Sequence, residues 1–274
     1  MRHDHYVPIT YLRRFTDTEG FLHIYDKKNQ RNRRQRPQKV CRERQGDENP
    51  RLNNPTAVRE ILECIEPEWG KAVDTIIEDP SDPNARYVIS SLMAYLMIWV
   101  PAKRRKYGKM LENKINADRP WLAKAVDQSP LNPDIKKDLY NSLINMKNKL
   151  EVDPYYTRTN GLVELPNIID SLYKSPFIIL HSPEEEYLIT SDNPILEFIS
   201  RENHNIKNFY LPLTPKFAVI LSSTIKNEYN TSEENANKVR RGIMSIYFFH
   251  EITKLIVQDA ERVVISCQKR RMFK

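Results

Sequence analysis

The chain has 274 residues, 40% of them hydrophobic, which is enough for one large core or two modest ones. Its three cysteines (Cys41, Cys64 and Cys267) are widely spaced and fit neither a disulfide framework nor a CxxC zinc pattern, so we expect a reducing, cytoplasmic setting. The longest apolar stretch, Tyr87 to Val100, is too short to span a bilayer, and we expect a soluble protein without a membrane partner.

The positive charge is concentrated in one segment. Lys27 to Arg44 holds nine Lys/Arg and one Glu, a net charge of +8, whereas the whole chain carries +7 and the remaining residues therefore sum to −1. This basic segment is the candidate contact for nucleic acid or another polyanion. The alternative is a solvated loop whose arginines make weak surface ion pairs. The candidate binding residues are Arg31, Arg33, Arg34, Arg36, Lys39 and Arg42, joined by Arg104 and Arg105 from a second basic cluster.

In chain order, the first expected element is a strand at Phe21–Tyr25, followed by a loop that contains the basic segment and Gln45–Asn54. A helical stripe then covers Thr56–Asp79, with Pro67 as a kink or as a break between two helices. Glu66 lies on the flank of this stripe and is expected to face inward, whereas Glu63 lies opposite it.

Asn84–Val100 is apolar nearly all round, which predicts a helix at the centre of the core. Pro101 ends or bends this helix, which can restart through Lys114. A further helix at Asp134–Leu150 has one apolar face, with Ile135, Leu139, Leu143, Met146 and Leu150, and is expected to be amphipathic and peripheral.

After Pro154 the pattern favours strands. Phe177–His181 is expected to pair with Tyr187–Thr190, and Phe209–Leu213 with Phe217–Ser222; a helix from Thr231/Ser232 to about His250 and short strands at Lys254–Val257 and Val263–Cys267 follow. The sequence therefore predicts an α+β fold in a single domain, 1–274. A mainly helical subregion, 1–153, packs with an antiparallel-leaning, β-rich subregion, 154–274, that contains one helix near 232–250.

Two short motifs contain residue types that do chemistry. His5 in His5-Tyr6-Val7-Pro8 is a candidate metal ligand or general acid/base, or else a hydrogen-bonded structural histidine. Asp192 in Ser191-Asp192-Asn193-Pro194 follows a strand at the lip of the expected sheet, where loops carry functional groups, although these residues also build ordinary tight turns. HExxH, DxDxDG, GxxxxGK[ST], GxSxG and GxGxxG are all absent from the sequence, which lowers the odds of a nucleotide-binding enzyme.

The aromatic residues near the N-terminus allow two interpretations. Tyr6, Tyr11, Phe15, Phe21 and Tyr25 interleave with arginines, a mixture that can stack bases and hold phosphates. Aromatic residues at this spacing are also typical of a core.

These residues together resemble a known family. His5 to Pro8, then Tyr11 to Phe15, Gly20 and Ile24 to Asp26, resemble the start of the widespread microbial HYxP-motif family, catalogued as domain of unknown function 4238. The resemblance continues in the family's order through the Glu63/Glu66 helix, the apolar helix ending near Pro101, the Ser191–Pro194 turn, Leu211–Pro215 and the helix containing Asn235 and Ala236. It covers nearly the whole chain. Where it implies an arginine before the proline of the apolar helix, this chain has Trp99, so that role passes to Arg104 or Arg105 or is lost.

The resemblance names relatives without a settled function. A histidine near the N-terminus, carboxylates on a helix and a late SDxP turn are similar to an active-site constellation, because these are acid/base and metal-binding residue types. On this basis the first hypothesis is a nuclease in an accessory or phage-defence setting. The basic segment grips the backbone, and His5, Glu66 and Asp192 act as general acid/base or hold a divalent metal such as Mg²⁺.

The second hypothesis is a non-catalytic adaptor that binds nucleic acid or protein. Here the HYVP segment (His5–Pro8) and the SDNP turn (Ser191–Pro194) fix the N-terminus against the sheet, and the basic segment recognises an acidic partner.

Overall fold

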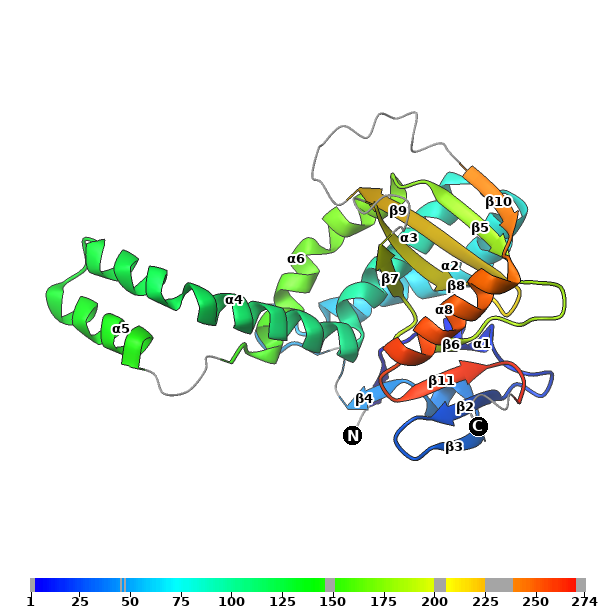
Figure 1. Ribbon diagram of the computed structural model, residues 1–274, viewed down its shortest axis with the longest axis horizontal. Helices are drawn as coiled ribbons and strands as arrows, with labels where there is room; N and C mark the ends of the chain where they lie inside the picture. Colours follow the sequence, from blue (N-terminus) through cyan, green and yellow to red (C-terminus); the bar gives the residue numbers. More distant parts are fainter. Residues whose placement is uncertain are drawn as a thin grey trace.

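The computed structural model describes residues 3–44, 46, 48–145, 151–199, 206–224 and 239–269, and its fold is α+β (Figure 1). Helix α3 (Pro83–Trp99) packs against α2 (Ala57–Glu78) and α6 (Pro154–Tyr173). It starts where the Asp82 side chain accepts a hydrogen bond from the Ala85 backbone N–H at 2.7 Å, with Pro83 in the first turn. Most of its side chains are buried, as its all-round apolar sequence predicts.

Two larger sheets lie beside these helices. The five-stranded sheet has the order β10-β5-β9-β8-β7, and consists of β5 (Phe177–His181), β7 (Leu196–Ile199), β8 (Ile206–Pro212), β9 (Phe217–Thr224) and β10 (Val239–Ile243). The four-stranded sheet has the order β3-β2-β11-β6, and consists of β2 (Leu22–Asp26), β3 (Arg31–Gln35), β6 (Thr190–Ser191) and β11 (Val263–Ser266). Only the β10–β5 pair is parallel among the described strands.

Each of these sheets contributes to two apolar clusters. In β9, Val219 and Leu221 join the cluster that contains α2, α3 and α6, whereas Ala218 and Ile220 join a second cluster with helix α8 (Ile246–Asp259). This alternation follows from the two-residue period of a strand. Helix α8 therefore covers one side of the sheets and the helical layer covers the other.

The N-terminal segment forms the smallest layer. Strand β1 (His3–His5) pairs with β4 (Arg42–Arg44), and the short helix α1 (Ile9–Arg13) follows. Tyr11 of α1 is fully buried against Phe15 and Trp69, with ring centroids 5.4 and 5.9 Å away. Its hydroxyl donates to the carbonyl of Pro212 at 3.0 Å and lies 2.7 Å from the Thr190 hydroxyl. Because a phenol has one proton, Thr190 is then the donor in the second bond.

The expected loop at the basic segment is wrong. Arg31–Gln35 forms strand β3, Pro37–Lys39 a 3₁₀ turn (η1), and Arg42–Arg44 strand β4. Strand β3 is an edge strand, and charged side chains are common on edges because they keep the open backbone from pairing with other chains. Because of this charged composition, the sequence did not predict strand β3.

The helical region also differs in part from the expectation. Helix α2 runs through Pro67 as one helix, so the alternative of two helices is wrong, and the restart after Pro101 extends well past Lys114, to give α4 (Pro101–Gln128). Helix α5 (Pro133–Asn145) is peripheral as expected, while residues 146–150 lie outside the described part of the chain. Helix α6 was not expected, although Asp153 caps it by accepting from the Tyr155 N–H at 2.7 Å.

The C-terminal expectations are partly wrong. Residues 187–189 are not a strand, and β6 pairs with β11 rather than with β5. Residues 231–238, where the helix was expected to begin, lie outside the described part, and Val239–Ile243 is a strand. The helix begins at Ile246 because Ser245 caps it, and it includes the expected strand Lys254–Val257. The strands at Phe177–His181, β8, β9 and β11 are confirmed.

Within the described residues, no single helix is long and apolar enough to cross a membrane. Only together do α3 and α4 have the length and apolar composition of a membrane span, and the two helices are bent by 58° at their junction.

The first prediction concerns the Tyr11 hydroxyl. Tyr11→Phe leaves the Pro212 carbonyl and the Thr190 hydroxyl without a partner in the core, and we expect the free energy of unfolding to fall by about 1–3 kcal/mol. Urea denaturation monitored by circular dichroism measures the change. Tyr87→Phe is the control, because Tyr87 is 55% exposed and its substitution should change stability by less than about 0.5 kcal/mol. Equal effects of the two substitutions contradict the prediction.

Candidate functional site

The HYVP segment connects β1 to α1. The Tyr6 backbone N–H donates to the carbonyl of Cys41 at 3.0 Å, and both side chains are buried. Cys41 has a φ of +53°, a left-handed conformation that is uncommon for a residue other than glycine. Val7 is fully buried, and Pro8 immediately precedes α1. The segment is thus held by backbone pairing and burial on both sides of His5.

His5 lies at the border of the basic segment. Its Nε2 is 3.2 Å from the carbonyl oxygen of Gln38, which can only accept, so Nε2 carries the proton and Nδ1 keeps its lone pair. The pKa of His5 is lowered overall, mainly because the ring is partly buried. Arg42 also lowers it, whereas the Gln38 carbonyl and the Glu66 carboxylate raise it. His5 is therefore uncharged at neutral pH.

Glu66 faces inward, as expected from the stripe of α2. Its Oε1 accepts from the Thr10 N–H at 3.3 Å and from the Thr10 hydroxyl at 3.1 Å. The carboxylate thus stabilises the first turn of α1, whose N–H groups have no partner within the helix. Glu63 is exposed, also as expected.

Asp192 is buried in the SDNP turn and accepts three backbone hydrogen bonds. Oδ1 receives the Glu261 N–H at 3.0 Å, and Oδ2 receives those of Arg262 at 2.8 Å and Val263 at 3.3 Å. Burial raises the pKa of Asp192 to about 6, although these three N–H groups act in the opposite direction. The carboxylate connects the turn before β7 to the turn between α8 and β11.

The three candidate catalytic residues fall into two neighbouring groups. Glu66 is close enough to His5 to raise its pKa, whereas Asp192 raises the pKa values of Tyr6 and Cys41, for which burial is the main cause. Tyr6 is therefore the residue of the HYVP segment that lies next to the SDNP turn. Among the described residues, no three His, Cys, Asp or Glu side chains form a group that could hold a metal ion.

Three cations of the basic segment have structural partners. The Lys27 ammonium donates to carbonyls at the C-terminal end of α8, including that of Val257 at 2.8 Å. Arg34 pairs with Asp17 at 2.6 Å and Glu19 at 3.1 Å, and Arg33 lies 4.0 Å from Asp26. These side chains fix β2 and β3 to their surroundings.

The other cations of the segment are exposed. Six side chains have no acidic partner within 4.0 Å among the described residues: Lys28, Arg31, Arg36, Lys39, Arg42 and Arg44. Lys39 and Arg42 belong to η1 and β4, on either side of Cys41 and beside His5. Unneutralised cations grouped along one segment give a local positive potential.

Arg104 and Arg105 differ from this group because each has an acidic partner, although Arg105 is exposed. Arg104 is mostly buried, forms an ion pair with Glu43 of β4, and its guanidinium lies 5.7 Å from the Trp99 ring centroid. Arg105 forms an ion pair with Glu261. Arg158 lies at a similar distance, 5.9 Å, so two arginines lie beside Trp99, the position at which an arginine was expected.

Most N-terminal aromatic residues belong to the core. Tyr6, Tyr11 and Phe15 are buried, and the half-buried ring of Phe21 is covered by the guanidinium groups of Arg34 and Arg36 at 4.4 and 4.6 Å. The buried three are not available to stack bases.

The sequence did not indicate a partly buried ionic network beside the SDNP turn. The Lys103 ammonium lies 3.0 Å from Glu197 and 3.8 Å from Asp259, and Lys207 lies 2.8 Å from Glu197. Burial raises the pKa of Glu197, but the two lysines outweigh it and lower the pKa to about 2. Asn193 of the turn donates to Asp259 at 2.7 Å, which joins the motif to this network. The one sequence signal for this network is the position of Glu197 between two apolar residues of β7.

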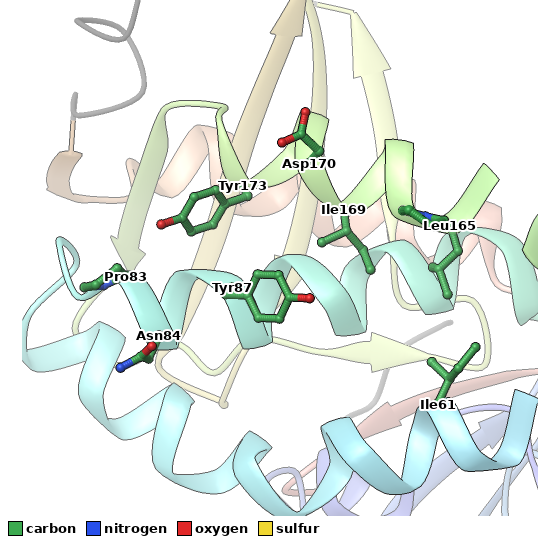
Figure 2. Close-up of a pocket in the computed structure, with 9 residues that line it drawn as sticks. Ile61, Pro83, Asn84, Tyr87, Leu165, Ile169, Asp170 and Tyr173 are labelled. Carbon is green, nitrogen blue, oxygen red and sulfur yellow. The ribbon is translucent and has the colours of Figure 1, made fainter. Parts of the chain in front are cut away.

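A separate groove of about 670 Å³ lies between α2, α3 and α6 (Figure 2). Its walls are mostly apolar, and Tyr87 and Tyr173 meet edge to face with centroids 6.2 Å apart. None of the candidate catalytic or nucleic-acid-binding residues lines it.

The family model described as Protein of unknown function (DUF4238) matches residues 3–270. The chain belongs to this family. No curated protein and no solved structure matches it. Both motifs and the basic segment of this DUF4238 protein lie inside the matched region.

The second prediction concerns Asp192. Its pKa in the folded state, about 6, is above the usual 3.8, so its contribution to stability is complete below about pH 4 and is lost as the pH rises through 6. We expect the difference in unfolding free energy between wild type and Asp192→Asn to fall by up to about 3 kcal/mol from pH 4 to pH 7. Urea denaturation across this range measures it.

Asp74→Asn is the matched control. The pKa of Asp74 is lowered by Arg14, so this carboxylate stays ionised from about pH 4.5 to 7, and the corresponding difference should be constant there. A constant difference for Asp192→Asn as well contradicts the prediction.

Proposed function

We propose that this DUF4238 protein binds a nucleic-acid backbone through the exposed cations of the basic segment, and that the HYVP segment and the SDNP turn are structural. One observation carries the proposal: six cations between Lys28 and Arg44 are exposed without an acidic partner within 4.0 Å among the described residues. A nucleic-acid backbone suits such a group of cations as a ligand, because it carries many phosphates and each contact releases a condensed counterion.

Several contacts support the structural role of the motifs. The polar atoms of Glu66 and Asp192 accept hydrogen bonds from Thr10 and from three backbone N–H groups, and His5 donates to Gln38. Each contact joins two segments far apart in the chain. Both oxygens of Asp192 are occupied by protein donors, which leaves this carboxylate poorly placed to bind a substrate, whereas the bonds to Glu66 use Oε1.

The third prediction tests the basic segment. The triple variant Arg36→Ala, Lys39→Ala and Arg42→Ala should bind a fluorescent DNA duplex more weakly, because up to three phosphate contacts are lost. The slope of log affinity against log salt should become less steep by up to about 3. Fluorescence anisotropy at several salt concentrations measures both quantities.

A control triple variant changes net charge equally at exposed sites on α2, at the end of α6 and on α8: Lys71→Ala, Lys174→Ala and Lys254→Ala. It should keep the wild-type slope. If both triple variants lose the same affinity, or if wild type shows no dependence on salt, the basic segment is not the nucleic-acid site.

Hydrolysis of the bound nucleic acid is a second candidate function, favoured by one observation. The pKa of His5 is lowered from its usual value, whereas the pKa of Asp192 is raised to about 6. His5 directly precedes Tyr6 in the chain, and Asp192 is close enough to Tyr6 to raise the pKa of its hydroxyl. Groups with such shifts occur often at acid/base sites. A nuclease in a defence setting would use His5 Nδ1, which keeps its lone pair, as the base.

The fourth prediction separates the two candidates. In His5→Gln the side-chain amide can still donate to the Gln38 carbonyl but cannot exchange a proton near neutral pH. If the protein is a binder only, neither wild type nor the variant cleaves labelled RNA or DNA, with or without Mg²⁺, and the two bind equally. Cleavage by wild type that is lost in a variant of unchanged melting temperature supports the nuclease. Cleavage that persists in the variant excludes His5 as the base.

A further inference from the structure

The two helices α4 and α5 form a hairpin that extends away from both sheets (Figure 1). We call residues Lys109 to Asn145 the arm. Its helices lie side by side, joined in part by the Arg119 guanidinium, which donates to the Leu143 carbonyl at 3.0 Å, and by Lys136, which donates to the Asp127 carbonyl at 3.0 Å.

The arm buries little of its apolar surface. Between residues 109 and 143, Ala123 alone is buried. Trp121 is 69% exposed, Ile135 51% and Leu139 42%, and Met110, Leu131 and Tyr140 are also exposed. A helix as short as α5 depends on the burial of one face for its stability, since helices shorter than about 12–15 residues are marginal in water. Among the described residues, therefore, α5 is covered only by α4, and the face with Ile135 and Leu139 is left uncovered.

The exposed apolar residues lie on defined helix faces. Ile135 and Leu139 are four residues apart and so neighbours on one face of α5, while Met110 and Trp121 of α4 are eleven residues apart, or about three turns. An amphipathic helical hairpin of this kind matches one half of a four-helix bundle.

The charge of the arm favours a second copy of the same chain over other partners. Its six Lys/Arg and five Asp/Glu give a net charge of +1, in contrast to +8 for the basic segment, so two arms do not repel each other. On α5, Asp134 and Asp138 lie on either side of Lys136 and Lys137. An antiparallel two-fold arrangement brings the acidic residues of one copy near the basic residues of the other, which is the self-complementarity that a symmetric dimer needs.

We propose that the arms of two copies pack together as an antiparallel four-helix bundle and make the protein a homodimer. The side chains of Ile135 and Leu139, with Trp121, form the centre of this interface. The dimer holds two basic segments in one particle, but the inference does not depend on what the basic segments bind.

The fifth prediction tests the interface by sedimentation velocity of the full chain between about 1 and 100 µM. Wild type should sediment as a dimer with a mass near twice 32.4 kDa. The double variant Ile135→Lys and Leu139→Lys should raise the dimer dissociation constant by at least about 100-fold, because it places four lysines in an apolar interface. Both positions are exposed in the monomer, so its circular dichroism spectrum and the melting of the remaining fold should be unchanged.

Val163→Lys is the matched control, because Val163 is an equally apolar, 66% exposed residue on α6 outside the arm. It should leave the dimer intact. A monomeric wild type across the whole concentration range overturns the proposal, and so does a dimer that the double variant and the control affect equally.

Discussion

The hydroxyl of Tyr11 is the point at which the parts of this fold meet. It belongs to the short helix α1, yet it donates to Pro212 at the end of β8 in the five-stranded sheet and lies 2.7 Å from Thr190 of β6 in the four-stranded sheet. Both sheets and the helical layer converge on this side chain, whose ring packs on Trp69 of α2. In the core, where water cannot replace a lost partner, such bonds constrain the relative positions of the elements they join.

Both sequence motifs take part in this convergence. The HYVP segment brings α1 to the sheets, with Glu66 completing the first turn of that helix, and the SDNP turn follows Thr190 directly. Asp192 then holds the turn before β11, and Asn193 reaches the ionic network of Lys103 and Glu197. These contacts hold elements together whether or not the same residues also perform chemistry, which is why residue type alone could not separate the hypotheses.

The sequence predicted the elements that bury one regular face or are buried all round. Helices α2 and α3, the strand at Phe177–His181 and the β8–β9 pair show apolar residues at the period of their structure. Strand β3 was missed because, as an edge strand, it is identified by backbone pairing rather than by apolar side chains. Helix α6 was missed although Asp153-Pro154 and the spacing of Leu162, Leu165, Ile169 and Leu172 indicated it. The contact between Tyr11 and Thr190 could not be predicted, because 179 residues separate them and only the folded chain brings them together.

The pairing of β2 with β11 has a consequence for biosynthesis. Ile24 faces Ile265, so the four-stranded sheet joins segments 241 residues apart, and α1 reaches its partners in β6 and β8 only after residues 190 and 212 have been made. Contacts of such sequence separation form late, because the entropy lost in closing the loop precedes the energy gained. On the ribosome, the apolar faces of β2 and α1 therefore stay uncovered until β6, β8 and β11 have emerged. Chaperones have that interval in which to act, and premature termination leaves those faces without their partners.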